Sequence, residues 1–532
     1  MPRQTSVLSP NLSLKRVVRK PSVRSKNGIV VTQNRIASEV GAKVLKAGGH
    51  AVDAAIAAAF TIGVVEPWMS GIGGVGAMLV YDAKTGKTTG LDFGAVSPRA
   101  LDPKDYPVVG GKDGNLFGWS AVKDNRNTVG ASAVCTPSQP AGMAEAHRRW
   151  GRKRWAELVA PAIKQAESGL VVDWHAMLTI TTAFADLRND PGAARRFLPG
   201  GLPPQPPTAT LADGVVKLPM MDLARTLKAI ASDGAGALYK SELARAIAQD
   251  IKSMGGCLSE EDLGAVRVAE YAPQVISYGG RSIHVLPELN GGPTLAVAFD
   301  ELKKNRKKPD AKPSAKTFVA YASAMRAGWE HRFKRMGDAG DRTAPTSTTH
   351  LCVVDRDGNM VTLTQTLLSL FGARIVLPKS GILMNNGINW FDPQAGGPNA
   401  IGPAKRALAN YAPAIMTGHD TVMAVGGCGG RKIIPAVFQL LAMSADFGFE
   451  LDELFHEPRI DVSGLGPIAV DRRLGPRTLA ALSESFDTVV AEPVPYPFPF
   501  TIAGAVRRVK GMNEGATEPE QPCSEAVSED DV

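Results

Sequence analysis

A run of hydroxyl side chains, Thr346-Ser347-Thr348-Thr349, stands directly before an apolar stretch that ends at Asp355. A threonine hydroxyl is a poor nucleophile unless a base lies beside it. At the start of a chain the threonine's own α-amino group, with a pKa of about 7.7–8.0, supplies that base. Thr348 could reach this state by attacking the carbonyl carbon of Ser347, forming an ester that water then hydrolyses. On composition and spacing alone, however, an ordinary Ser/Thr-rich loop is the better interpretation.

Such a nucleophile needs a rigid strand behind it, and the residues after Thr348 can form one. Apolar and polar residues alternate on both sides of Asp357-Gly358, which predicts a hairpin that begins at Thr349. A second hairpin is expected from Met78–Tyr81 and Thr88–Asp92, joined by a turn over Asp82–Lys87.

The N-terminal half is mainly helical in pattern. Gly28–Thr32 reads as a short strand, and 35–65 as two packed helices separated at Gly48-Gly49. Residues 139–340 are again mainly helical in their spacing. Helices followed by strands that flank the threonine indicate a layered α/β architecture.

The glycines of Gly71-Ile72-Gly73-Gly74-Val75-Gly76 match the G-x-G-x-x-G dinucleotide motif. That motif binds pyrophosphate only when a strand precedes it and a helix follows. Here a helix precedes and a strand follows, so we reject a Rossmann site and expect the glycines to allow close backbone packing.

Composition and charge exclude several classes of protein. The chain has 532 residues, 44% of them hydrophobic and 21% charged, which is typical of a globular protein. Residues 1–27 carry basic but no acidic side chains, and we expect a disordered arm that binds neither nucleic acid nor membrane. No signal peptide or membrane span is visible. The five cysteines are scattered, with no metal-type spacing and no disulfide framework. Together these observations predict a cytoplasmic protein without a metal, and we expect no cofactor.

Several segments together resemble the γ-glutamyltranspeptidase family. They are VLKAGGHAVDAAIAAAFTIGVVEPWMSGIGGVGAMLVYD (44–82), TTHLCVVDRDGNMVTLTQT (348–366), FGARIVLPKSGILMNNGINWFDP (371–393) and VGGCGG (425–430). The likeness runs from about Gly28 to Ile460 and is weaker after that. Because so many motifs follow in the family's order, the chain is identified as a member.

The resemblance implies a four-layer αββα N-terminal-nucleophile (Ntn) hydrolase fold. It also implies a cut between Ser347 and Thr348, which gives a large subunit (28–347) and a small subunit (348–532) that stay together as a heterodimer. Thr348 matches the family's nucleophile and Thr366 the threonine that hydrogen-bonds it. Gly429 and Gly430 match the backbone N–H pair of the oxyanion hole, a kind of donor whose loss costs roughly 3–4 kcal/mol in other amide-cleaving enzymes.

The departures from the family concern the substrate pocket. Gly94 follows Asp92-Phe93, where the family has the arginine that binds the substrate α-carboxylate. Trp390 stands where an acid holds the substrate amino group. Other departures are Gly387 for a common glutamine, Leu368 for an asparagine, and Ala409-Asn410 for a serine pair. Arg374 is a candidate for a replacement cation, although an ordinary surface arginine is an equally good interpretation of the sequence. Asn410 and Asn386 are further candidates for substrate binding.

The leading hypothesis is a self-cleaving threonine amidohydrolase that hydrolyses, or transfers, the acyl group of γ-glutamyl amides such as glutathione through a γ-glutamyl ester. One alternative keeps the machinery for another small-molecule amide, as in cephalosporin acylases or oxamate amidohydrolase. The other is an uncut, non-catalytic scaffold. The sequence leaves open the balance of hydrolysis and transfer and any higher oligomer.

Overall fold

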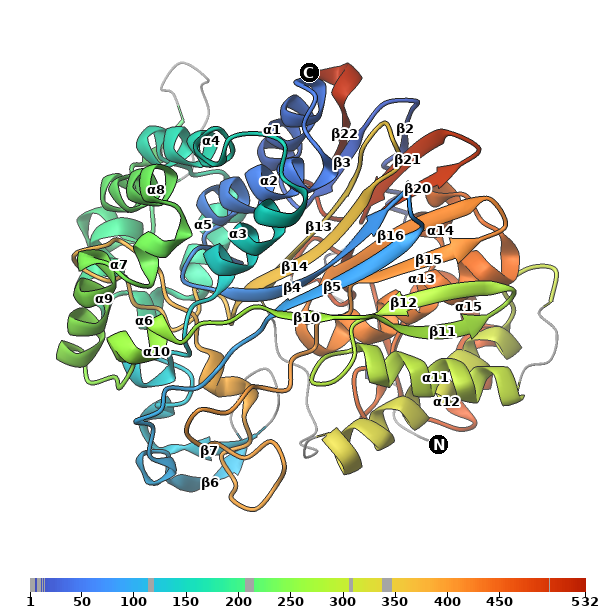
Figure 1. The fold of residues 1–532 in the computed structure, drawn as a ribbon. Coiled ribbons are helices and arrows are strands. Elements are labelled where there is room, and N and C mark those ends of the chain that lie inside the picture. Colours follow the sequence, from blue (N-terminus) through green and yellow to red (C-terminus); the bar gives the residue numbers. More distant parts are fainter. Residues whose placement is uncertain are drawn as a thin grey trace.

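The computed structural model describes residues 5–6, 11, 13, 15–112, 119–205, 215–305, 310–336, 347–496 and 498–532, with the backbone alone at Thr5, Ser6 and Ser347. Two large antiparallel sheets cross the molecule and helices cover their outer faces (Figure 1). The predicted αββα fold is confirmed.

The first sheet contains strands from both sides of the Ser347–Thr348 bond. Within the described residues its order is β10-β5-β4-β14-β13-β3-β22, and every neighbouring pair is antiparallel. The strands are β10 (Ala269–Tyr271), β5 (Lys87–Phe93), β4 (Val75–Asp82), β14 (Met360–Leu368), β13 (Ser347–Val354), β3 (Ile29–Thr32) and β22 (Glu525–Ser528). All three elements predicted as strands here, namely the two hairpins and 28–32, are confirmed.

The second sheet packs face to face on the first, with β13 and β14 against β16 and β20. Its described order is β11-β12-β15-β16-β20-β21-β2, again antiparallel throughout. The strands are β11 (Gln274–Tyr278), β12 (Arg281–Val285), β15 (Ala414–Gly418), β16 (Thr421–Cys428), β20 (Ile502–Val509), β21 (Met512–Thr517) and β2 (Val23–Ser25). Each sheet is covered on both faces, and every residue of the central strand β14 is buried, including its threonines and Gln365.

Helices form the two outer layers (Figure 1). The layer on the first sheet includes α1 (Arg35–Lys46), α2 (Ala51–Val65) and α3 (Gln139–Trp150), with α4 (Trp155–Ser168), α5 (Trp174–Thr182), α6 (Phe184–Leu187), α7 (Pro191–Phe197), α8 (Met221–Asp233), α9 (Glu242–Ser253) and α10 (Glu260–Gly264) beyond. The layer on the second includes α11 (Gly292–Asn305), α12 (Ala315–His331), α13 (Ile433–Phe447), α14 (Leu451–His456) and α15 (Gly475–Ser483). Smaller sheets join β1 (Thr5–Ser6), β19 (Thr488–Ala491), β18 (Ile468–Asp471) and β17 (Ile460–Asp461), then β6 (Val108–Lys112) with β7 (Ser120–Val122), and β8 (Leu170–Val171) with β9 (Lys217–Leu218).

The glycines of the rejected dinucleotide motif lie between α2 and β4 and bring backbones together. A Cβ added to Gly74 would lie 2.5 Å from the carbonyl oxygen of Thr366, and one added to Gly76 would lie 2.4 Å from that of Thr364. No side chain fits at these distances, so the glycines let β4 and its preceding loop lie against β14. The prediction of close packing is confirmed.

Two predictions need correction. The described part of the predicted disordered arm, from Lys15, packs on the acidic C-terminal segment: Arg16 pairs with Glu520 at 2.9 Å, and Lys20 Nζ donates to the carbonyl of Ser524 at 2.8 Å. Opposite charges at the two ends of the chain therefore hold each other. The region 139–340 also contributes strands β10, β11 and β12, whose short hairpin was missed among the helices.

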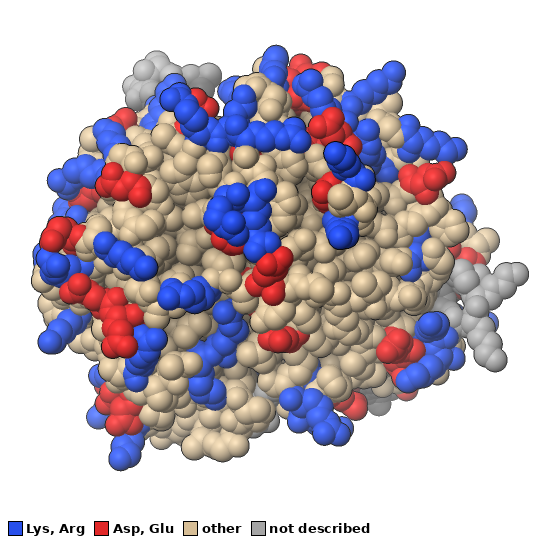
Figure 2. Space-filling view, in the orientation of Figure 1, with Lys and Arg blue, Asp and Glu red and all other residues tan. Residues whose placement is uncertain are grey.

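Within the described residues no helix is both long and apolar enough to cross a bilayer. On the face seen in Figure 2, lysine and arginine side chains are interspersed with aspartate and glutamate.

Candidate active site

Thr348 lies at an irregularity in the pairing of β13 with β14. Ser347 pairs with Leu368 and Thr349 with Gln365, so the register shifts across Thr348. Such bulges re-aim a side chain out of the regular alternation, and they are frequent beside active sites. The Thr348 side chain is 4% exposed, and its hydroxyl donates to Thr366 Oγ1 at 3.2 Å. The structure thus brings the two predicted threonines together.

Thr366 links Thr348 to a strained turn. Its Oγ1 also accepts the backbone N–H of Leu368 at 2.8 Å, and Leu368 is the residue paired with Ser347. Leu368 has a φ of 85°, in the left-handed region that non-glycine residues rarely adopt. Such a residue costs about 1–3 kcal/mol and persists only when its surroundings fix it. Strain is therefore held directly opposite the bond expected to break.

The glycine pair lies at the carboxyl end of β16. Gly429 has a φ of 127° and Gly430 a φ of 59°, and both are buried. Glycine is required here because other residues are strained at such angles. The pair leads through a short turn into α13, and N–H groups before a helix have no intrahelical acceptor. These N–H groups have the position of donors that could serve an oxyanion, and the oxyanion hole stays a prediction.

Buried polar contacts fix β13 against β16. His350 Nδ1 lies 3.0 Å from Thr364 Oγ1, and its ring lies over Gly426, where an added Cβ would be 2.2 Å from Cε1. Thr362 Oγ1 donates to the carbonyl of Val425 at 3.1 Å. Thr348 lies two residues before His350 on β13, and Gly429 lies three residues after Gly426, just past the end of β16. Because His350 and Gly426 are in contact, we infer that Thr348 and Gly429 lie at the same end of the sandwich.

His350 itself is a structural residue in this arrangement. Complete burial lowers the pKa of its imidazole to about 3, so the ring is neutral. Its described partners are Thr364, Thr362 and Cys352, and no described contact joins it to Thr348.

Asn386 supports the turn after β14. Its Oδ1 accepts the N–H of Ser369 at 3.0 Å, and its Nδ2 donates to Ser369 Oγ at 2.8 Å and to the carbonyl of Thr128 at 2.9 Å. Both ends of this amide are thus engaged within the protein. The geometry gives Asn386 the position of a residue that holds the Leu368 turn.

Arg374 is engaged with a carboxylate of the protein. Its Nε lies 3.2 Å from Asp186 Oδ2 on α6, and its side chain is 14% exposed. Burial lowers the pKa of its guanidinium, and Asp186 raises it in part. The described contacts do not bring Arg374 to Thr348.

Asn410 leads to an arginine that sequence reasoning missed. Its Oδ1 accepts from Arg332 Nη2 at 2.9 Å, and Arg332, at the end of α12, is 2% exposed. Arg332 begins a π-helical turn (332–336), a feature frequent at functional sites. The only hint in the sequence was that Arg332 has aromatic residues close by in the chain, Trp329 and Phe333, which favour burial of the arginine between them.

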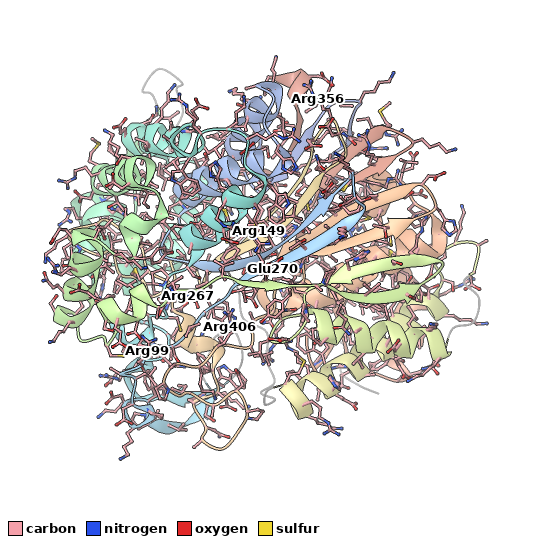
Figure 3. The ribbon with its side chains drawn as sticks, in the orientation of Figure 1. Arg99, Arg149, Arg267, Glu270, Arg356 and Arg406 are labelled. Carbon is pink, nitrogen blue, oxygen red and sulfur yellow. The ribbon has the colours of Figure 1, made fainter. Side chains whose placement is uncertain are left out.

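A second missed arginine occupies the space left by the absent clamp. A Cβ added to Gly94 would lie 3.3 Å from Arg406 Nη1, and Arg406 pairs with the buried Asp92 at 2.8 Å. In Figure 3, Arg406 lies below Glu270 of β10. Nearby, Trp390 is 3% exposed and meets the ring of Tyr411 at 5.8 Å. The pocket is therefore built differently from the one that the family pattern describes.

Among the described residues no group of three or more His, Cys, Asp or Glu side chains is arranged to hold a metal ion. The chemistry available at Thr348 is that of its hydroxyl, the Thr366 hydroxyl and nearby backbone N–H groups. These groups suit nucleophilic attack on a carbonyl and stabilisation of the resulting oxyanion.

Comparison with known proteins agrees with this geometry. The family model described as Gamma-glutamyltranspeptidase matches residues 37–347 and 339–528. The chain is 31% identical over 490 residues to the glutathione hydrolase proenzyme of Bacillus subtilis (strain 168), covering 82% of this chain and 80% of that one. It is 32% identical over 511 residues to the acylase ACY 1 proenzyme of Pseudomonas sp. (strain SE83), covering 89% of each.

A solved cephalosporin acylase from Bacillus halodurans superposes with a TM-score of 0.82 at 24% identity, covering 98% of this chain and 99% of that one, and so shows the same fold. With two thirds or more of the sequence matched and the two threonines in contact, this chain belongs to the gamma-glutamyltranspeptidase family.

Proposed function

We propose that the chain cleaves itself between Ser347 and Thr348 and then, through Thr348, hydrolyses γ-glutamyl amides such as glutathione. The observation that carries the proposal is the Thr348–Thr366 contact of 3.2 Å at a bulge opposite the strained Leu368. The names of the relatives support it, since they are glutathione hydrolase and acylase proenzymes.

Self-cleavage begins with attack of Thr348 Oγ on the carbonyl carbon of Ser347. The peptide nitrogen leaves as the Thr348 amine, and the acyl group of Ser347 moves to the hydroxyl as an ester. Water then hydrolyses the ester, leaving a carboxylate on Ser347 and a free α-amino group on Thr348. Both parts contribute strands to both sheets, so we expect them to remain together as large and small subunits.

Substrate hydrolysis reuses these groups. The α-amino group of Thr348 accepts the hydroxyl proton while Oγ attacks the γ-carbonyl carbon, and the N–H groups of Gly429 and Gly430 stabilise the oxyanion. The same amine, now protonated, gives its proton to the leaving nitrogen, and an ester remains on Thr348. Water releases the acid, whereas an acceptor amine in place of water would give transfer.

A related amide with another acyl group is the second candidate. With Gly94 and Trp390 at these positions, the chain lacks both charged side chains with which the family binds a γ-glutamyl group. The match to the acylase covers 89% of this chain, against 82% for the match to the Bacillus subtilis hydrolase. An apolar acyl group would suit Trp390, whereas a small acid, as in an oxamate amidohydrolase, would need a cation.

The test is hydrolysis of γ-glutamyl-p-nitroanilide by the wild type, by Thr348→Ala and by Thr348→Ser. We expect release of p-nitroaniline by the wild type, none by Thr348→Ala, and partial activity with Thr348→Ser, which keeps the hydroxyl. Equal activity in all three would refute Thr348 as the nucleophile. Activity confined to other acyl anilides would favour the second candidate.

A further inference from the structure

A closed ring, made of side-chain contacts and of residues adjacent in the chain, adjoins the glycine pair. Arg431 follows Gly430 directly, and its guanidinium lies over the rings of Trp119 at 5.9 Å and Phe333 at 5.2 Å. Trp119 Nε1 donates to the carbonyl of Asn389 at 3.0 Å, next to Trp390.

From Trp390 the ring passes to Tyr411 and Asn410, and from Asn410 to Arg332, the neighbour of Phe333. Arg431 and Arg332 thus belong to one aromatic cluster, and they lie close enough for the charge of Arg431 to lower the pKa of Arg332. The ring lies immediately beyond the proposed oxyanion hole.

Arg332 carries a positive charge that no carboxylate of a described residue neutralises. Its described hydrogen bonds go to neutral oxygens only: the carbonyls of Asn290 (2.8 Å) and Ala409 (2.7 Å), Thr294 Oγ1 (3.4 Å) and Asn410 Oδ1 (2.9 Å). No carboxylate of a described residue lies within ion-pair distance of it. Burial and the charge of Arg431 lower the pKa of Arg332 to about 9. A buried cation of this kind is costly unless an anion approaches it.

Arg332 also fixes the direction of the Asn410 amide. A guanidinium has only donors, so it can bind only the carbonyl oxygen of that amide. The Nδ2 group must therefore point away from Arg332, and it has no hydrogen-bond partner among the described residues. Two N–H donors are thus presented at the position where the family has a serine hydroxyl.

A cavity beside this ring also carries an excess of positive charge. Its volume is about 620 Å³, and among the described residues its walls carry Arg335, Lys405 and Arg406, the last paired with Asp92, against Glu288. Arg335 and His331 lie on the same helical end as Arg332. A cavity lined mainly by cations attracts anionic ligands.

We propose that Asn410 Nδ2 and Arg431 bind a free carboxylate at the far end of the substrate's acyl group, with Arg332 as the positioning residue for Asn410. This inference rests on the proposed function. In place of the arginine that the family has at the position of Gly94, the carboxylate is recognised by residues from the end of α12, from 409–411 and from the turn after β16. Trp390 stands where a substrate ammonium would need an acid. The preferred acyl group is therefore one with a terminal carboxylate and no required amino group.

The test compares three p-nitroanilides of five-carbon acyl groups: glutaryl, γ-glutamyl and pentanoyl. Glutaryl and pentanoyl differ by a carboxylate in place of a methyl group, and γ-glutamyl adds the amino group. We expect the wild type to favour glutaryl over pentanoyl at least tenfold in kcat/KM, and to gain nothing from the amino group. A charge-assisted hydrogen bond accounts for a discrimination of about 10- to 100-fold.

Two variants locate the recognition. Arg431→Met should lower the glutaryl-to-pentanoyl ratio of kcat/KM about 10- to 100-fold, mainly through KM, and Arg431→Lys should restore part of it. Asn410→Asp should lower the same ratio without lowering the melting temperature, because the new carboxylate pairs with Arg332 and repels the substrate. The control is Arg196→Met, which removes another buried guanidinium, bound to the carbonyl of Gly381, and should leave the ratio unchanged.

The outcomes separate the two proposals. A chain that stays uncut refutes the proposed function and this inference with it. A processed enzyme that hydrolyses glutaryl and pentanoyl anilides equally keeps the function and overturns the inference, as does a ratio that neither Arg431→Met nor Asn410→Asp alters. If the processed enzyme cleaves none of the anilides, calorimetry with glutarate and pentanoate decides: the inference requires binding of glutarate that Asn410→Asp abolishes.

Discussion

Replacing Thr366 by valine should slow self-cleavage while leaving the fold intact. Valine keeps the shape of threonine but removes the oxygen that accepts both the Thr348 hydroxyl (3.2 Å) and the N–H of Leu368 (2.8 Å). Thr366 is fully buried, so water cannot replace the lost acceptor.

The size of the effect follows from these two contacts. Leaving the buried Leu368 N–H without a partner costs about 1–3 kcal/mol, and losing the contact to Thr348 costs about 0.5–1.5 kcal/mol more. If both contacts hold the reacting geometry, their sum slows cleavage by about 10- to 1,000-fold, since about 1.4 kcal/mol corresponds to a factor of ten.

The assay is a time course of precursor loss on a denaturing gel after purification of the uncut chain. Thr364→Val is the matched control, because Thr364 lies on the same strand, is equally buried and bonds His350 Nδ1 at 3.0 Å instead of Thr348. We expect comparable losses of stability in the two variants but slow cleavage only in Thr366→Val. Cleavage of Thr366→Val at the wild-type rate, or equal slowing in both variants, would refute the reasoning.

Three further predictions test the supports of the site. Gly426→Ala should destabilise the fold by about 1–3 kcal/mol or more, because the new Cβ would lie 2.2 Å from the His350 ring; thermal melting beside Gly236→Ala, where no atom lies within 4 Å, checks this. His350 is neutral when folded, with a pKa of about 3, but titrates near 6.5 when unfolded, so stability should fall as the pH drops from about 6.5 toward 3, by about 1.4 kcal/mol per pH unit from this group. Urea unfolding at several pH values should show a shallower slope in His350→Gln; an identical slope would contradict the assignment. Gly94→Arg alone should not lower the KM for γ-glutamyl-p-nitroanilide, because Arg406 occupies the space beside Gly94. The double variant Gly94→Arg with Arg406→Ala should lower this KM. A lower KM in the single variant would show that the space beside Gly94 is free.

The sequence predicted the parts of the molecule that are dictated locally. Alternation around Asp357-Gly358 gave the β13–β14 hairpin, and the Gly48-Gly49 break separated α1 from α2. The pairing of Thr348 with Thr366 came from the family likeness, because 18 residues of sequence separation show no contact by themselves.

What the sequence did not reveal depends on contacts between distant segments. The Arg332–Asn410 bond spans 78 residues, and the Arg406–Asp92 pair spans 314. A basic N-terminal segment looks disordered when read alone, yet Arg16 meets Glu520 across 504 residues. Arg374 is a candidate because it lies within a matched segment (371–393), whereas its partner Asp186 lies in a helix outside the quoted motifs.

The most direct test of the account is the intact mass, under denaturing conditions, of the purified wild type and of Thr348→Ala. We expect two fragments from the wild type, the smaller beginning at Thr348 and ending at Val532, and a single uncut chain from the variant. A wild type that stays whole, or a cut at another bond, would contradict the claim that Thr348 becomes an N-terminal nucleophile.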